Sequence, residues 1–388
     1  MIRILTFVFL ILAFVIGGFA IFPKSLDSRS EVKIGVILPT NSNLEDVLSA
    51  KRGLELGETK INASGGIGGR KLSIIFEDGG CDSRKSGEAA KKLIDSGIKI
   101  IIAGSCKEET ASIAGVVKNY EGILVSYAGL DSGIAGAGES AYSVTSPDFF
   151  EGSFLANYFI NDLKINKSAL LYDKSVFGQA SSDNFRKYFS DSDGEVVLDS
   201  AVDFSKDIEE VASQVKASKP EAVYVAIDSK DNGFEILKKI REEGVNAYFA
   251  SPISIFDGEN ISKNPKTFEG SIAISPDIDW KNNLASQNFR EEYKTAFGDY
   301  PSRLSFYAYD SLFIVKDAIS ANYHGGELNI KNISEWMKSL TNWSGVSGLI
   351  TMDSGGNGIS SRSLKKVNKA QIVDVGQYTI DAEKQEGY

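Results

Sequence analysis

The chain has 388 residues, of which 42% are hydrophobic and 24% are charged, and its formal net charge is -10 with a pI near 5.0. This length favours two domains of ordinary size, and the composition is that of a globular protein. An acidic chain without a run of Lys and Arg does not favour nucleic-acid binding, and a single histidine, His324, argues against histidine catalysis and multi-histidine metal sites.

The N-terminus has the pattern of a targeting segment. Arg3 precedes an uncharged apolar run from Ile4 to Phe22, with small residues at Gly18 and Ala20. This pattern is typical of a signal peptide that is cleaved after Ala20, although the run is also long enough for a marginal membrane anchor. Residues 1–28 are therefore predicted to be a signal peptide or an anchor. The rest of the chain is predicted to work outside the cytoplasm, in the periplasm or at the cell surface.

A location outside the cytoplasm bears on the state of the two cysteines, Cys81 and Cys106. An even, low count in an exported chain favours a disulfide, which would contribute about 3 kcal/mol through the unfolded state. Two buried free thiols are the alternative.

From residue 32 onward, short β-rich runs alternate with helical segments. Strands are predicted at Val32–Leu38, Lys71–Glu77, Lys99–Ala103 and Ile123–Ser126, with helices over Leu44–Asn62, Ser86–Ser96 and Glu108–Tyr120 between them. The glycine-rich stretch Ser64–Lys71 follows a helix and precedes a strand. This order is the reverse of a phosphate loop, so the stretch is predicted to be a turn.

The alternation then restarts. Helices are predicted at Phe149–Leu163, Ser181–Phe189, Ile208–Ala217 and Gly233–Glu243, and strands at Ala169–Tyr172, Val196–Ala201, Ala222–Ile227 and Ser271–Ile274. Two long helices, Ala285–Phe297 and Leu304–Ala321, and two strand-like pieces, Gly348–Met352 and Ile372–Val375, complete the chain. Apolar strands between helices predict an α/β fold with two doubly wound units, each a parallel sheet covered on both faces.

Ligands of open parallel sheets bind beyond the carboxyl ends of the strands. The loops to inspect are residues 39–43, 78–82, 104–110 and 127–131 in the first unit, and residues 173–178, 228–232 and 251–256 in the second.

No catalytic arrangement stands out in the sequence. There is no Gly-X-Ser-X-Gly nucleophile elbow, and no pair of carboxylates is singled out by its spacing. The stretch Asp353–Gly358 has the look of a calcium loop but lacks the later bidentate carboxylate, so a polar hairpin turn is predicted. The sequence therefore predicts neither an enzyme nor a bound metal or cofactor.

The order of short motifs along the chain is more informative about the protein family than the residue types alone. Asn62–Lys71, then Glu77-Asp78, Cys81-Asp82 and Ala90–Ile94, resembles the type I periplasmic binding proteins, and within them the branched-chain amino-acid-binding subgroup. Tyr172-Asp173-Lys174 with Phe177-Gly178, Tyr307–Asp310 and Gly348–Asp353 match later in the chain, and the resemblance extends from residue 32 to about residue 376.

The resemblance implies two Rossmann-like α/β lobes joined by a three-segment hinge, the type I fold. The chain would cross between the lobes near Ser146, Pro276 and Val346. Residues 32–146 and 277–346 would form the N-terminal lobe, residues 147–276 and 347–380 the C-terminal lobe, and residues 381–388 a polar tail. The resemblance also implies that the two cysteines pair.

The same resemblance implies a function. The protein would capture a small polar ligand, an amino acid or a related compound, by hinge closure. As a monomer it would deliver this ligand to the membrane permease of an ABC importer. A membrane-tethered sensor with the same fold is the alternative, and it is favoured if Ile4–Phe22 is retained.

The ligand contacts of the family fall on positions that only partly fit. Thr110, Gly129 and Phe177 are of the usual types, whereas Asp228 stands at an aromatic position and Ile253 at an acidic one. Together with the strand-end loops, these positions predict the ligand-binding residues Lys107, Glu108, Thr110, Tyr127, Gly129, Asp131, Phe177, Asp228 and Phe256.

The charges among these positions suit a ligand with two charged groups. Lys107 is suited to pair with a carboxylate, and Asp131 or Asp228 with an ammonium. The alternative is that Lys107, Glu108 and Glu109 only face solvent at a helix start, where the helix dipole favours glutamate.

Overall fold

The computed structural model describes residues 27–40, 44–129, 140–205, 208–276, 278, 280–323 and 328–378. The apolar run Ile4–Phe22, His324, Asp131 and the polar tail 381–388 lie outside these residues. No helix in the described part of the chain is long and apolar enough to cross a membrane.

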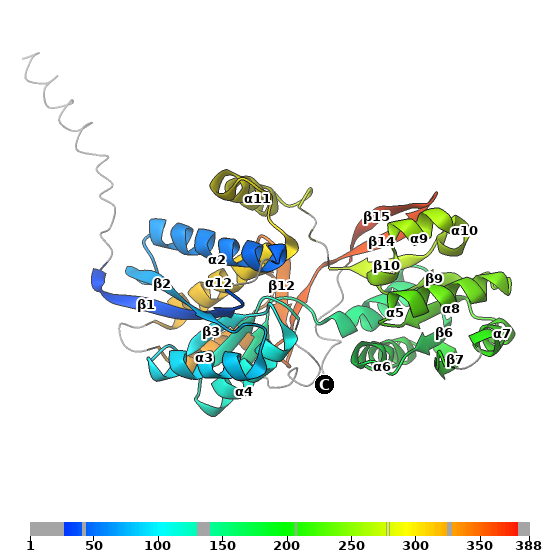
Figure 1. Ribbon diagram of the computed structural model, residues 1–388, viewed down its shortest axis with the longest axis horizontal. Helices are drawn as coiled ribbons and strands as arrows, with labels where there is room; N and C mark the ends of the chain where they lie inside the picture. The colour runs from blue at the N-terminus through cyan, green and yellow to red at the C-terminus, as the bar shows by residue number, and fades with distance from the viewer. Residues whose placement is uncertain are drawn as a thin grey trace, which may run out of the picture.

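Lobe 1 is built on a five-stranded parallel sheet with the order β2-β1-β3-β4-β5 (Figure 1). Its strands are β1 (Asp27–Leu38), β2 (Arg70–Asp78), β3 (Ile100–Ala103), β4 (Ile123–Ser126) and β5 (Ala141–Ser143). Its helices are α2 (Glu45–Ala63), α3 (Ser83–Asp95), α4 (Lys107–Asn119), α11 (Leu284–Phe297), α12 (Arg303–Asn322) and α13 (Ile330–Lys338).

The strands of lobe 1 are apolar on both faces, and each face has its own helices. Val36 and Ile102 pack with residues of α2, α12 and α13, whereas Ile37 and Ile101 pack with residues of α3 and α4. Successive residues of a strand point to opposite faces, so an unbroken apolar strand needs cover on both sides. This explains why continuous apolar runs in the sequence predicted a doubly wound unit.

Lobe 2 is built on a seven-stranded sheet with the order β15-β14-β10-β9-β8-β6-β7. The parallel strands are β6 (Lys167–Tyr172), β7 (Glu195–Ala201), β8 (Ala222–Ala226), β9 (Tyr248–Ala250) and β10 (Ile272–Ser275), and β14 (Arg362–Asn368) and β15 (Gln371–Tyr378) are antiparallel additions at one edge. The helical segments are η1 (Asp148–Phe150), α5 (Glu151–Asn161), α6 (Val176–Asp191), α7 (Ile208–Ser218), α8 (Lys230–Glu242), η2 (Ile253–Ile255), α9 (Gly258–Lys263) and α10 (Pro265–Phe268). The predicted α/β fold with two doubly wound lobes is confirmed.

Three passages of the chain join the lobes (Figure 1). The first lies between β5 and η1, and the second between β10 and α11. A small third sheet of β11 (Trp343–Ser344), β12 (Leu349–Met352) and β13 (Gly358–Ser360) lies at the third passage.

The third passage differs from the expectation. Ile350 and Met352 of β12 belong to the core of lobe 1, whereas β14 pairs with β10 in lobe 2. We infer that the chain crosses after β12 and not near Val346, because β12 packs in lobe 1 whereas Ile359 of β13 already packs in the core of lobe 2. The apolar side chains of β12 decide this, because they complete the first core.

The first and third passages are hydrogen-bonded to each other. The Ser146 hydroxyl donates to the carbonyl of Gly358 at 3.1 Å and accepts from the amide of Ser360 at 3.2 Å. The buried guanidinium of Arg362 donates to the carbonyls of Ser146 and Pro147. These two passages therefore form one structural unit at the hinge.

Both predicted turns are confirmed. Residues 64–69 connect α2 to β2, with positive φ angles at Gly65, Gly66, Gly68 and Gly69. Residues 353–357 connect β12 to β13, and the Asp353 carboxylate accepts from the Asn357 amide at 2.7 Å.

Candidate ligand-binding site

The carboxyl ends of the two parallel sheets face the hinge. β5 of lobe 1 leads directly into the first passage, and β10 of lobe 2 leads into the second. Strands that run parallel within one sheet end at the same edge, so the loops after β1–β4 and after β6 and β8 lie on the sides that the lobes turn toward each other (Figure 1). Among the described predicted ligand residues, Lys107, Glu108, Phe177 and Asp228 are accessible at these two edges.

Asp78, the last residue of β2, organises the edge of lobe 1. Its Oδ1 accepts from the backbone amides of Thr40 at 3.0 Å and Gly80 at 3.1 Å, and its Oδ2 accepts from the Lys85 ammonium. The hydrogen bond from Lys85 holds the pKa of Asp78 below its ordinary value. The carboxylate thus holds the loops after β1 and β2 in a fixed relation.

The predicted disulfide between Cys81 and Cys106 is confirmed, with the two Cα atoms 5.4 Å apart. It joins the loop after β2 to the residue that caps the N-terminus of α4. Lys107 and Glu108 follow immediately in the first turn of α4 and are exposed. The disulfide therefore fixes the point from which these two charged side chains extend.

Glu109, on the same turn, is fully buried, so the expectation that it faces solvent is wrong. Its Oε2 accepts from the Cys81 amide at 3.2 Å, its Oε1 has no hydrogen-bond partner, and burial raises its pKa. A Cβ on Gly79 would lie 2.2 Å from Oε2, so the carboxyl group occupies space that only glycine leaves free. Glu109 therefore supports the loop after β2 from inside the lobe and does not face a ligand.

Among the described residues, one group of three potential metal-ligating side chains is present, that of Cys81, Cys106 and Glu109. The two sulfur atoms are bonded to each other, so they offer no thiolate. In the oxidised protein this group provides a single carboxyl group, which does not suffice for a metal site.

Three further predicted residues of lobe 1 have structural roles. Tyr127 is completely buried in the first core, where its hydroxyl bonds to the Ser105 hydroxyl at 2.5 Å, so it does not reach the surface between the lobes. Thr110 is also buried, and its hydroxyl donates to the Cys106 carbonyl at 2.8 Å. A Cβ on Gly129 would lie 2.7 Å from the Cα of Pro147, so packing against the first passage requires this glycine.

Asp173 organises the edge of lobe 2 as Asp78 does that of lobe 1. Its Oδ1 accepts from the amide and the hydroxyl of Ser175, and its Oδ2 accepts from the Asp228 amide at 3.1 Å. The Ser175 hydroxyl in turn caps α6 by accepting from the Gly178 amide at 2.9 Å. The loops after β6 and β8 are therefore held together by one carboxylate.

Two predicted residues of lobe 2 are accessible on this edge. Phe177 is half-buried in the first turn of α6, beside Val176, which is 70% exposed. Asp228 is exposed, and its carboxylate has no ion pair or hydrogen bond within the described part of the chain. Phe256 is different, since it is buried in the second lobe against Phe268 and does not reach this surface.

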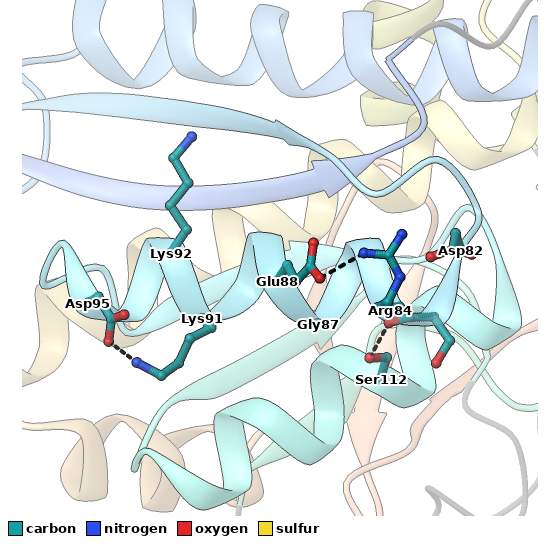
Figure 2. Close-up of a pocket in the computed structure, with 9 residues that line it drawn as sticks. Asp82, Arg84, Gly87, Glu88, Lys91, Lys92, Asp95 and Ser112 are labelled. Carbon is teal, nitrogen blue, oxygen red and sulfur yellow. Dashed lines mark hydrogen bonds and ion pairs between the residues drawn. The ribbon is translucent and has the colours of Figure 1, made fainter.

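Three surface cavities lie elsewhere in the described structure. They measure about 970 Å³ between α3 and α4, about 580 Å³ beside the second passage, and about 1040 Å³ along α13. In the first cavity, Arg84 pairs with Glu88 and Lys91 pairs with Asp95, so its charges are neutralised in pairs (Figure 2). None of the three is lined by a predicted ligand residue.

The comparisons with known proteins agree with this geometry. The family model described as periplasmic binding protein matches residues 31–367. An amino acid binding protein of Pseudomonas aeruginosa is 25% identical over 329 residues, which cover 81% of this chain and 84% of that protein.

Solved structures share the fold. A putative branched-chain amino acid ABC transporter protein of Rhodospirillum rubrum superposes with a TM-score of 0.76 at 18% identity, over 89% of this chain and 100% of that one. The branched-chain amino acid transporter substrate-binding protein of Streptococcus pneumoniae in complex with isoleucine gives a TM-score of 0.61 at 19% identity, over 90% and 99% of the two chains.

Proposed function

We propose that this chain, which belongs to the periplasmic binding protein family, captures a small polar solute outside the cytoplasm and delivers it to the permease of an ABC importer. The observation that carries the proposal is the pair of strand-end edges turned toward each other across three chain passages. Relatives of the chain are solute-binding proteins rather than enzymes.

The exposed side chains on the two edges suggest the chemistry of the solute. Lys107 on lobe 1 suits a carboxylate, Asp228 on lobe 2 suits an ammonium, and Phe177 offers an apolar surface on the same edge of lobe 2. A ligand with all three features is an amino acid with an apolar side chain. Isoleucine, the ligand in the related Streptococcus pneumoniae structure, has this chemistry.

This arrangement requires closure of the hinge. Lys107 and Asp228 belong to different lobes, so a ligand that contacts both is bound better when the lobes close. A ligand shifts a conformational equilibrium by its difference in affinity for the two states. Closure would then be driven by the zwitterion itself, and the closed form would be the one that the permease recognises.

A thermal-shift screen of the oxidised protein without its apolar N-terminal run tests the proposal. The library contains amino acids, small carboxylates, amides and purines. A ligand at a hundred times its dissociation constant stabilises the folded state by about 2.7 kcal/mol. We expect the amino acids with apolar side chains to raise the melting temperature. A folded protein with no shift for any compound would contradict uptake of small polar solutes.

The variants Asp228→Asn and Lys107→Gln test the assignment of the two charges. Removing one partner of a desolvated charge pair costs about 2–5 kcal/mol, so each variant should raise the Kd at least about thirtyfold. Asp231→Asn in the first turn of the following helix, α8, and Lys266→Gln on α10 make the same changes of charge at exposed positions that are not assigned to the ligand. If Asp228→Asn and Lys107→Gln bind the amino acid with unchanged affinity, the two proposed contacts are wrong.

A further inference from the structure

The cavity along α13 lies on the side of lobe 1 opposite to the proposed solute site. Lys99, Gly122 and Ser140 line it, and they directly precede β3, β4 and β5. The cavity therefore opens at the amino ends of the parallel strands, whereas the solute site lies at their carboxyl ends. Its other walls come from the end of α4 and from α13. Occupancy of one site leaves the other accessible.

The walls of this cavity carry unpaired positive charge. Lys99, Lys118 and Lys338 come from three different elements, are exposed, and form no ion pair with any described residue. A fourth lysine, Lys331, is 4.0 Å from Glu335. Glu121 and Glu335 also line the cavity, so its four lysines leave an excess of two positive charges, which repel one another, in a chain whose net charge is -10. An anion in the cavity would relieve this repulsion.

Two further features of the wall favour an anion. The side chain of Ser140 is 7% exposed, and its hydroxyl has no hydrogen-bond partner. Buried hydroxyl groups normally form hydrogen bonds, so the Ser140 hydroxyl is left available to donate to an acceptor in the cavity. The N-terminus of α13, a helix of nine residues, also lines the cavity, and the positive end of a helix dipole attracts anions.

The cavity between α3 and α4 provides the contrast. Its volume is similar, about 970 Å³ against about 1040 Å³, but its arginine and lysines each have an acidic partner. The charges of that cavity are thus paired, whereas three lysines of the α13 cavity form no ion pair with a described residue.

We propose that the α13 cavity is a second binding site, specific for a phosphate group and independent of the solute site. Several lysines around one cavity suit an oxyanion with several oxygen atoms, each of which accepts a charge-assisted hydrogen bond. Lys99, Lys118 and Lys338 supply the charge, and Ser140 supplies a neutral donor. The phosphate group comes either from a soluble compound or from a lipid headgroup.

Site-specific acetylation of the full chain in neutral detergent tests this site, with inorganic pyrophosphate as the probe and mass spectrometry as the readout. We expect pyrophosphate to slow acetylation of Lys99, Lys118 and Lys338 at least threefold, with Lys219 and Lys266 on lobe 2 unchanged. Protection by phosphatidylglycerol bicelles, but not by phosphatidylcholine bicelles, would identify the lipid headgroup as the source. Absence of protection with both probes, or equal protection of all lysines, overturns the proposal.

A pair of double variants provides the matched control. Lys99→Gln with Lys118→Gln should weaken pyrophosphate binding at least tenfold, while the response to the solute in the thermal-shift screen stays unchanged. Lys219→Gln with Lys266→Gln makes the same change of net charge at exposed positions on lobe 2 and should leave pyrophosphate binding unchanged. Equal weakening in both double variants would show only a general effect of charge and would overturn the site.

Discussion

The two strand-end edges use the same structural device with different reinforcement. In each lobe, a glycine leaves space for a carboxyl group that holds a loop, because a Cβ would lie 2.2 Å from Glu109 Oε2 at Gly79 and 2.2 Å from Asp173 Oδ1 at Gly178. Lobe 1 adds a disulfide to this device. Both cysteines of the chain are in lobe 1, so lobe 2 relies on hydrogen bonds alone. The comparison indicates that the edge of lobe 1 is a fixed platform and that the edge of lobe 2 is more easily deformed.

Removal of the disulfide should have the largest effect on this difference. The double variant Cys81→Ser with Cys106→Ser should lower the free energy of unfolding by about 3 kcal/mol, because the unfolded chain regains the entropy of a closed loop. Hydrogen exchange resolved by lobe should show faster opening of lobe 1 with lobe 2 unchanged. An equal effect in both lobes would contradict the distinction between the two edges.

Alanine at the two glycines should reveal the shared device. Gly178→Ala should destabilise lobe 2 by about 2 kcal/mol, since its Cβ would also lie 2.8 Å from the Asp173 backbone carbonyl. Gly79→Ala should cost at least as much, because the disulfide limits the loop movement that would relieve the contact with Glu109. Denaturant unfolding of each variant measures these costs. Gly115→Ala, where a Cβ meets no atom within 4 Å, is the control and should not destabilise the fold.

Stability should depend on pH through a half-buried carboxyl group at the start of lobe 2, that of Glu151. Burial and the nearby Asp148 raise the pKa of Glu151 to about 8, above its ordinary value of 4.5. The folded protein therefore keeps this proton where the unfolded chain has lost it, and stability falls as pH rises from about 4.5 through about 8.

Between pH 7 and pH 9 this loss amounts to about 1.4 kcal/mol. Glu151→Gln should remove it, as chemical denaturation at a series of pH values will show. If the free energy of unfolding of Glu151→Gln falls with pH as steeply as before, other groups cause the pH dependence.

The smallest effect is expected at the surface of lobe 1. Arg84 and Glu88 form an ion pair at 2.8 Å, but their side chains are 78% and 65% exposed. Arg84→Ala should change the free energy of unfolding by less than about 0.5 kcal/mol, because water and salt screen exposed pairs. A loss above 1 kcal/mol in urea unfolding would mean that α3 contributes more to the platform than its contacts suggest.

The sequence predicted the central parallel strands because they are apolar along their length, as in β3 and β8. It did not predict β5 or β9, since strands of three residues are too short to show a periodicity. It also did not predict β14, where Arg362, Lys365 and Lys366 alternate little with apolar residues. It gave no sign that β12 packs in the core of lobe 1, because this contact joins segments far apart in the chain.

For the site, the order of residues predicted the disulfide, and it placed Lys107, Phe177 and Asp228 on the facing edges. The alternative that Glu109 faces solvent came from its place in the first turn of a helix, where the helix dipole favours glutamate. Its burial depends on the space left by Gly79, which only the folded structure reveals. Tyr127 and Phe256 were selected from their loops, but each turns into its own core, where a large aromatic ring loses most water contact.

Small-angle X-ray scattering of the oxidised protein, titrated with amino acids that have apolar side chains, tests the central claim most directly. We predict a saturable decrease in the radius of gyration, with the same midpoint as the thermal stabilisation. The decrease should be lost in Asp228→Asn and retained in Asp231→Asn. Saturable binding with an unchanged radius of gyration would contradict capture by closure of the two lobes.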